Sequence, residues 1–236
     1  MQEFLRFFGH GFCHQIPARS FESGGLVFSA CSRDTGIYLG FFFAVVAAFL
    51  IYARSTDKPT GLLPAPFIIA LSFFIVPMAF DGVTSYLGLR PTTNTIRYIT
   101  GFFAGAAGGT VFAPLLFALR ADAAPQKQIF AQPSKAIAQL VLTFVLGATF
   151  FFGYPYLGVV SPFLAVAAFV AIIVSVNLVL LTLSKRFAVR HTVVHWLLLL
   201  AFCLVLALVE IALLGAIRTV LIQSLFGGHE FYEFLT

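Results

Sequence analysis

The chain has 236 residues, of which 60% are hydrophobic and only 10% are charged. Its mean hydropathy is +1.00, and its 30 Phe residues would give a soluble domain more apolar surface than it could bury. Lipid tails solvate such surface without penalty, so the composition excludes a water-soluble protein and predicts one integral membrane domain over 1–236. The net charge of +5 follows from the loops of such a protein and gives no reason to propose nucleic acid as a partner.

Six continuous apolar runs can each cross a hydrocarbon core of roughly 30 Å as a helix, which takes about 20 residues. Strands are excluded because lipid offers no partner for unpaired backbone groups. The sequence therefore predicts an all-α, polytopic bundle of about six transmembrane helices over 35–218, with a segment 1–34 before it and a tail 219–236 after it. The expected spans are Thr35–Ala53, Leu62–Phe80, Tyr98–Leu119, Ile137–Tyr156, Val159–Ser184 and Val193–Ile217. No basic, short apolar leader precedes the first run, so no removable signal peptide is expected.

Six spans place both termini on one side of the membrane. The loops on the other side carry eight Lys and Arg against two acidic residues, whereas the side with the termini carries six of each. Because Lys and Arg stay cytoplasmic, we expect a multi-pass protein of the cell inner (plasma) membrane with extracytoplasmic N- and C-termini.

Two polar regions fall on the side with the termini. The first runs from Cys13-His14-Gln15 through Arg19-Ser20-Phe21 to the stretch 31–38, which reads Cys-Ser-Arg-Asp-Thr-Gly-Ile-Tyr. The second is the connection from Asp81 to Arg97, which is far more polar than the short turn 154–162 on the same side. The topology therefore predicts that the two regions share one site.

These residues resemble a family of prokaryotic membrane proteins, domain of unknown function 2085. The likeness lies in the first polar region and in Asp81-Gly82, Arg90, Asn94, Arg97 and Thr100-Gly101. Many members of that family have Cys-x-Arg-Cys where this chain has Cys31-Ser32-Arg33-Asp34, so one sulfur ligand of any family metal site is replaced here. The resemblance implies a membrane location and a shared site, and it supplies no established activity.

Four residues of the first region form a ligand set for zinc or iron. Cys13, His14, Cys31 and Asp34 offer two thiolates, an imidazole and a carboxylate, which can bind zinc tetrahedrally. The alternative is a Cys13–Cys31 disulfide, which would contribute about 3 kcal/mol in an oxidising exterior. Asp34 has a second interpretation as the N-cap of the first span. Cys203, alone in the last span, is expected to pack in the core.

The arginines of the two regions suit an anionic group. Guanidinium groups at Arg19, Arg33, Arg90 and Arg97 can bind phosphate or carboxylate, and Tyr38 and Asn94 are expected to help bind the substrate. Tyr38 follows Asp34 by four positions and shares its helix face. The alternatives are that the arginines anchor at the interface or pair with Glu22, Asp34 and Asp81, and that Asn94 caps the third span.

Glu210 lies inside the last apolar span, where an ionisable group is costly unless it is paired or protonated. We expect Asp81, Arg97 and Glu210 to act together as catalytic groups on an anionic substrate, with Arg97, Tyr38 or the outer arginines as possible partners of Glu210. The alternative is a structural glutamate. Two other features point to packing and anchoring. Gly101, Gly105 and Gly109 form a small-residue stripe that lets another helix approach, and His191 with His195 is explained by interfacial anchoring better than by metal binding.

Three functions of different classes remain. The first, and preferred, is an enzyme or binding protein whose extracytoplasmic site takes an anionic lipid-like or phosphorylated substrate, with membrane lipids as partners. The second is an ion-coupled transporter that uses Glu210. The third is a non-catalytic subunit of a membrane complex with a Cys13–Cys31 disulfide. No phosphate-binding loop, nucleophile elbow or His-Glu-x-x-His motif is present, so the sequence leaves open whether the protein is an enzyme.

Overall fold

The computed structural model describes residues 1–52, 59–61, 64–119, 133–183 and 192–226. Within these ranges six helical segments are long and apolar enough to cross a membrane, which confirms the expected all-α, polytopic bundle. In chain order they are α2 (Ser32–Tyr52), α3 (Ala65–Ser72) with α4 (Ile75–Tyr86), α5 (Asn94–Ala118), α6 (Pro133–Gly153), α7 (Val160–Leu183) and α8 (Val193–Phe226). The predicted boundaries Ala53, Leu62 and Ser184, and residues 227–236 of the tail, lie outside the described residues.

The second span is two helices rather than one. Helix α3 ends at Ser72 and α4 starts at Ile75, with Phe73 and Phe74 in a turn between them. Pro77 explains the break, because its ring has no N–H to give to the carbonyl of Phe73 and would collide with that carbonyl in a continuous helix. Helix α4 then extends to Tyr86, past the predicted end at Phe80.

The helices that carry the polar residues begin earlier than predicted. Helix α2 starts directly after Cys31, whose carbonyl accepts a hydrogen bond from the backbone N–H of Thr35 at 2.9 Å. Asp34 is therefore inside the first turn of α2, and its predicted role as N-cap is wrong. Helix α5 is capped by Thr93, whose side chain accepts from the N–H of Ile96, so the capping role considered for Asn94 is also wrong.

The segment before α2 is folded. It contains the amphipathic helix α1 (Gln2–His10), the 3₁₀ turn η1 (Pro17–Arg19) and a hairpin of two short strands, β1 (Glu22–Ser23) and β2 (Leu26–Val27). The hairpin turns at Gly24 and Gly25, whose φ angles are +60° and +73°. Positive φ at both central residues is the type I′ geometry that matches the twist of paired strands.

Among the described helices, α2 and α5 share the most extensive contact. A Cβ atom added at Gly101 or Gly105 would lie 2.1 Å from the carbonyl oxygen of Arg33 or Ile37, respectively, and one added at Gly36 would lie 2.3 Å from that of Tyr98. The small-residue stripe is thus a helix–helix contact, as predicted. This contact sets the first turn of α2 beside the first turn of α5.

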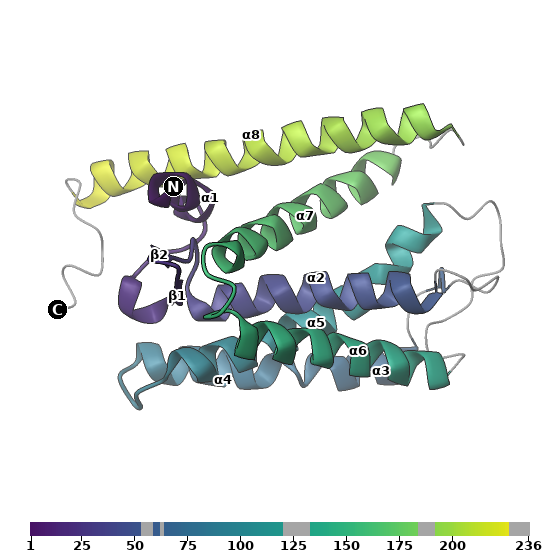
Figure 1. Cartoon of the computed structure of the whole chain (residues 1–236), viewed down its shortest axis with the longest axis horizontal. Coiled ribbons are helices and arrows are strands. Elements are labelled where there is room, and N and C mark those ends of the chain that lie inside the picture. Colours follow the sequence, from purple (N-terminus) through teal and green to yellow (C-terminus); the bar gives the residue numbers. More distant parts are fainter. Residues whose placement is uncertain (53–58, 62–63, 120–132, 184–191, 227–236) are drawn as a thin grey trace.

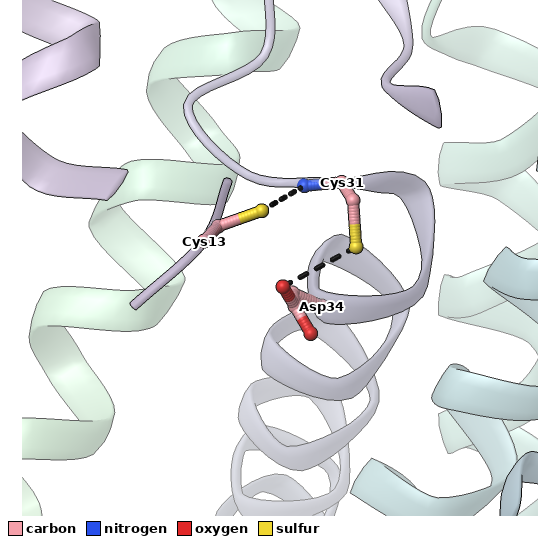
Figure 2. Close-up of side chains that lie close together, drawn as sticks. All are labelled: Cys13, Cys31 and Asp34. Atoms are coloured by element: carbon pink, nitrogen blue, oxygen red, sulfur yellow. Dashed lines mark hydrogen bonds between the residues drawn. The ribbon is translucent and has the colours of Figure 1, made fainter. Parts of the chain in front are cut away.

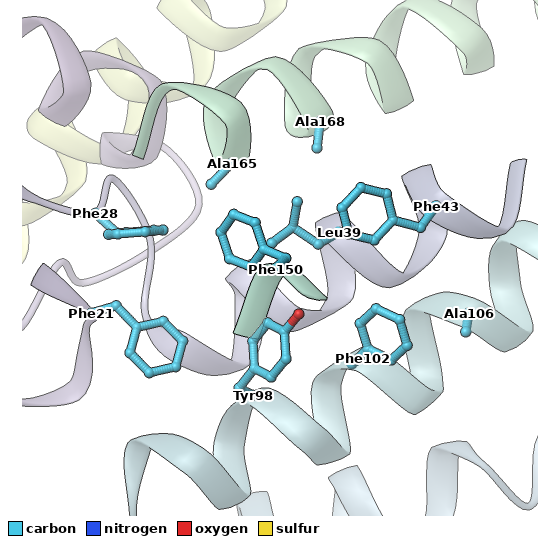
Figure 3. Close-up of a cluster of buried hydrophobic side chains, with 10 residues drawn as sticks. All are labelled: Phe21, Phe28, Leu39, Phe43, Tyr98, Phe102, Ala106, Phe150, Ala165 and Ala168. Carbon is cyan, nitrogen blue, oxygen red and sulfur yellow. The ribbon is translucent and has the colours of Figure 1, made fainter. Parts of the chain in front are cut away.

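An aromatic core fixes the N-terminal segment to the bundle (Figure 3). Phe21 and Phe28, on either side of the β1–β2 hairpin, are buried against rings from α5 and α6. The centroids of the Phe21 and Tyr98 rings are 5.7 Å apart, and those of Phe28 and Phe150 are 6.4 Å apart. Burial of rings of this size anchors the segment at one end of the bundle.

Helices α2 and α8 lie in different parts of the bundle (Figure 1). Helix α2 packs against α5, α6 and α7, while α8 packs mainly against α7 and α1. Figure 1 shows α8 along one edge, with α7 crossing between it and the remaining helices, and α1 seen nearly end-on between α8 and the β1–β2 hairpin. The bundle end that carries α1 and the hairpin also carries the α4–α5 connection, and we call it the site end.

Candidate metal and anion site

Three side chains meet at the start of α2 (Figure 2). The Sγ atoms of Cys13 and Cys31 and a carboxylate oxygen of Asp34 all lie within 4.8 Å of one another. The backbone N–H of Cys31 donates to Cys13 Sγ at 3.1 Å, and Cys31 Sγ donates to Asp34 Oδ2 at 3.2 Å. The group combines two sulfur donors with one oxygen donor, a set that zinc and iron accept.

Both cysteines are free thiols in this structure, so the disulfide considered from the sequence is not formed. Their environments differ. The interaction with the Cys13 side chain, burial and the nearby Asp34 carboxylate raise the pKa of Cys31 well above its ordinary value. The same thiol–thiol interaction lowers the pKa of Cys13. The thiolate is the form of cysteine that binds metal.

His14 does not belong to the three-residue group. Its side chain is exposed, although it lines the cavity beside the cysteines. Of the four ligands predicted from the sequence, the structure brings three together.

The loop that presents Cys13 is held by two residues, Gln15 and Arg218, for which the sequence indicated no role. Gln15 has a φ of +55°, and its side chain donates to the carbonyls of Arg6 at 2.8 Å and Ser29 at 2.9 Å. Arg218 of α8 donates to the carbonyl of His10 at 2.5 Å and to that of Cys13. Because these contacts involve backbone carbonyls far away in the sequence, spacing alone could not have indicated them.

A cavity of about 250 Å³ opens beside the cysteine–aspartate group. Arg19, Arg33 and Arg97 line it together with Cys13, Cys31 and Asp34. The structure thus brings the N-terminal segment and the start of α5 to one place, as expected from the topology.

The three arginines are held in different ways. The guanidinium group of Arg33 forms an ion pair with Asp81, and its buried Nε has no hydrogen-bond partner among the described residues. Arg97 is buried and donates to Asn94 Oδ1 at 3.3 Å. Arg19 lies over the Tyr86 ring, 5.5 Å from its centroid. Within the described part of the chain, no carboxylate pairs with Arg19 or Arg97.

Asp81 is the centre of a buried ion-pair network. Its carboxylate, only 1% exposed, pairs with Arg33 and with Arg90 at 2.6 Å and accepts from Thr92 at 2.7 Å. These contacts tie α2, α4 and the α4–α5 connection together. Asp81 and Arg90 do not line the cavity, so their position fits the ion-pair alternative considered for this loop.

Two other residues that were predicted to bind substrate instead hold elements of the fold together. Asn94 donates to the carbonyls of Ala18 at 3.3 Å and Ser20 at 3.2 Å, which fastens the η1 turn to α5. The Tyr38 ring packs on that of Phe169, with centroids 4.6 Å apart. Neither residue lines the cavity.

Glu210 does not join Asp81 and Arg97. It accepts a hydrogen bond at 3.1 Å from Asn177 of α7, and it does not line the cavity. Cys203 is buried in an apolar cluster between α5, α7 and α8, as predicted. His191 lies outside the described residues, so its pairing with His195 has no structural description.

The fold and this site define a class: a polytopic helical membrane protein with a cysteine–aspartate group at one end of its bundle. The model of a family described as predicted membrane proteins, DUF2085, matches residues 13–111. That segment contains the three potential ligands and the three cavity arginines. The chain belongs to this family of predicted membrane proteins.

Two relatives support the assignment. An uncharacterised protein of Methanocaldococcus jannaschii is 35% identical over 105 residues, which cover 44% of this chain and 64% of the relative. An uncharacterised protein of Methanothermobacter thermautotrophicus is 40% identical over 93 residues, covering 39% of this chain and 77% of the relative. No solved structure matches the chain.

Proposed function

We propose that the cavity at the site end is a metal-assisted binding site for a phosphate or carboxylate group. The observation that carries this proposal is the convergence of Cys13, Cys31 and Asp34 with three arginines around one cavity. The metal would be zinc or iron.

The donor atoms fit a tetrahedral metal with one open position. In a zinc site with Zn–S bonds of about 2.3 Å, two sulfur ligands lie roughly 3.8 Å apart. The three donor atoms lie within 4.8 Å of one another, so a side-chain adjustment of about 1 Å would close them around an ion. Three protein ligands leave a fourth position for water or substrate, which is the arrangement of catalytic rather than structural zinc sites.

The charges around the cavity favour an anion. A divalent ion with two thiolates and one carboxylate carries a net charge of −1. Arg19 and Arg97 add two positive charges with no carboxylate partner among the described residues, and the network of Arg33, Arg90 and Asp81 adds one more. The surplus is positive, and it includes the buried Arg97, at a depth where charge–charge attraction is stronger than in water. Guanidinium forks suit phosphate and carboxylate oxygens.

The proposed site lies on the extracytoplasmic side of the plasma membrane. This placement is supported by the excess of Lys and Arg in the loops at the opposite end. The choice between an enzyme and a binding protein rests on whether a bound anion reacts at the open metal position.

The metal is tested by elemental analysis of detergent-purified protein. We expect about one zinc or iron per chain, and loss of that metal in Cys31→Ser and Asp34→Asn. Cys203→Ala, which removes a thiol buried in an apolar cluster, is the matched control and should keep the metal. Wild-type protein with far less than stoichiometric metal would remove the metal from the proposal.

The anion is tested separately by equilibrium dialysis with radiolabelled inorganic phosphate. Arg97→Gln should weaken phosphate binding at least tenfold, because a buried guanidinium group would no longer face the anion. Lys135→Gln, on α6, whose ammonium group lies over the Tyr52 ring, should leave phosphate binding unchanged. Equal binding by wild type and Arg97→Gln would contradict the proposed anion site.

A further inference from the structure

Helix α1 has the features of a helix that lies in the plane of a membrane interface. Its buried face consists of Leu5, Phe8 and Gly9, whereas Phe4 and Phe7 are 54% and 45% exposed. In Figure 1 it is seen nearly end-on while α8 runs across the view, so it crosses the membrane-spanning direction. An amphipathic helix with exposed Phe side chains in this orientation is typical of the boundary between headgroups and acyl chains.

Exposed tyrosines at the site end indicate the same membrane depth as α1. Tyr86, at the end of α4, and Tyr156, in the α6–α7 turn, are 70% and 91% exposed. Exposed Tyr side chains gather at the membrane–water interface because one end of the ring is apolar and the other is polar. Tyr86 also lines the cavity that Arg19, Arg33 and Arg97 line, which we call the arginine cavity. That cavity therefore lies at the depth of lipid headgroups.

A second cavity, of about 700 Å³, lies between α1 and α8. It shares His14 and Gln15 with the arginine cavity, so the two adjoin. One wall is the polar edge of α1, with Glu3, Arg6 and His10. The other wall is the surface of α8, formed by Ile211, Ala212, Gly215 and Ala216. The α1 side therefore offers polar groups beside Phe7, and the α8 side offers an apolar surface made mostly of small residues.

The size of the two cavities argues against a small inorganic ion as the only ligand. Sites for organic ligands typically measure about 300–1,000 Å³, and the second cavity alone falls in that range at about 700 Å³. An inorganic phosphate would leave it unused. A ligand with a phosphate, a polar linker and an acyl chain would use both cavities and the α8 wall.

We propose that the ligand is an anionic phospholipid of the surrounding membrane. Its phosphate would bind at Arg19 and Arg97, its polar linker would lie along the polar edge of α1, and an acyl chain would leave along the α8 wall. This inference rests on the proposed anion site and adds the class of the ligand, whose source is the bilayer rather than the water.

The experiment uses full-length protein in nanodiscs of phosphatidylcholine with a minor fraction of phosphatidylglycerol. The protein is then extracted into mild detergent, and mass spectrometry counts the retained lipids. We expect about one phosphatidylglycerol per wild-type chain, retained in preference to phosphatidylcholine. Arg97→Gln should reduce this retention at least tenfold, and excess inorganic phosphate should displace the lipid poorly.

A variant that fills the second cavity separates this inference from the anion site. Ala216→Phe puts a ring on the α8 wall, and we expect it to reduce lipid retention at least fivefold with phosphate binding and metal content unchanged. Ala201→Phe, at an exposed position elsewhere on α8, is the matched control and should retain the lipid. Retention that is equal in Ala216→Phe and Ala201→Phe would overturn the phospholipid assignment while leaving the anion site intact. Loss of phosphate binding from wild type would instead count against the anion site.

Discussion

The contact between α2 and α5 gives the sharpest prediction about stability. Gly105 of α5 faces the backbone of Ile37, and a Cβ atom added there would lie 2.1 Å from the carbonyl oxygen of Ile37 and 2.8 Å from its carbonyl carbon. Ordinary contact begins at 3.4 Å. In Gly105→Ala the two backbones must therefore separate by about 1.3 Å along this direction, the difference between 3.4 and 2.1 Å.

That separation disturbs the tightest helix pair of the bundle. Overpacking of this kind costs about 1–3 kcal/mol, and the alanine returns up to about 1 kcal/mol through its higher helix propensity. The net effect of Gly105→Ala is a loss of stability, which lowers the thermal midpoint by several degrees, at roughly 2–4 °C for each kcal/mol in a chain of this size.

Gly108 is the matched control on the same helix. A Cβ atom there would lie 3.5 Å from the Phe41 ring, in ordinary contact, so Gly108→Ala should leave the midpoint unchanged or raise it. Thermal unfolding of both variants in the same detergent, followed by far-ultraviolet circular dichroism, measures the difference. A midpoint for Gly105→Ala that is equal to or above that of Gly108→Ala would refute the close backbone contact.

Three further changes test how the site end is held together. Asp81→Asn should lower the free energy of unfolding by about 3–5 kcal/mol, because it leaves two arginines at a buried site without their carboxylate. Chemical unfolding measures this loss. Glu3→Gln, at an exposed ion pair, is the control and should change the free energy of unfolding little. Phe21→Ala should cost about 3–5 kcal/mol in the same assay, and a loss no greater than that of Phe152→Ala, whose ring is 72% exposed, would contradict the anchoring role. Arg218→Gln should weaken zinc binding about 10–100-fold, because it releases the Cys13 carbonyl. A competition titration with a chelator measures the zinc affinity. Unchanged affinity would show that the Cys13 loop needs no support from α8.

The helices followed from the sequence because lipid imposes a simple rule. A continuous apolar run must satisfy its own backbone, so length and hydropathy sufficed to locate six spans. Their ends were less well predicted, since polar residues continue a helix once it leaves the hydrocarbon. Helix α8 shows this, because it runs to Phe226, past the predicted end at Ile217 and into the tail.

The site was predictable in part, for reasons visible in particular residues. Cys31 and Asp34 are three positions apart at a helix start, so their proximity is local and followed from spacing. Whether the guanidinium of Arg33 faces a substrate or Asp81 depends on the rotation of α2 and α4, which is set by packing between helices and not by either segment alone. Glu210 shows the same limit: its partner Asn177 lies in an apolar helix where no local pattern marked it.

The cavity is built from two sides that are held by different kinds of interaction. On the arginine side, the Asp81 network and the α2–α5 glycine contact fix Arg33 and Arg97 through buried ion pairs and backbone packing. On the cysteine side, the Cys13 loop is held by hydrogen bonds that backbone carbonyls accept from the side chains of Arg218 and Gln15. Helix α8, which supplies Arg218, packs mainly on α7 and α1. Helix α8 therefore supports the Cys13 loop directly, whereas among the described residues it makes no hydrogen bond or ion pair to Arg33 or Arg97. In the proposed site, a ligand bound between α1 and α8 would therefore contact the helix that holds the Cys13 carbonyl, while the contacts that hold Arg33 and Arg97 lie on other helices.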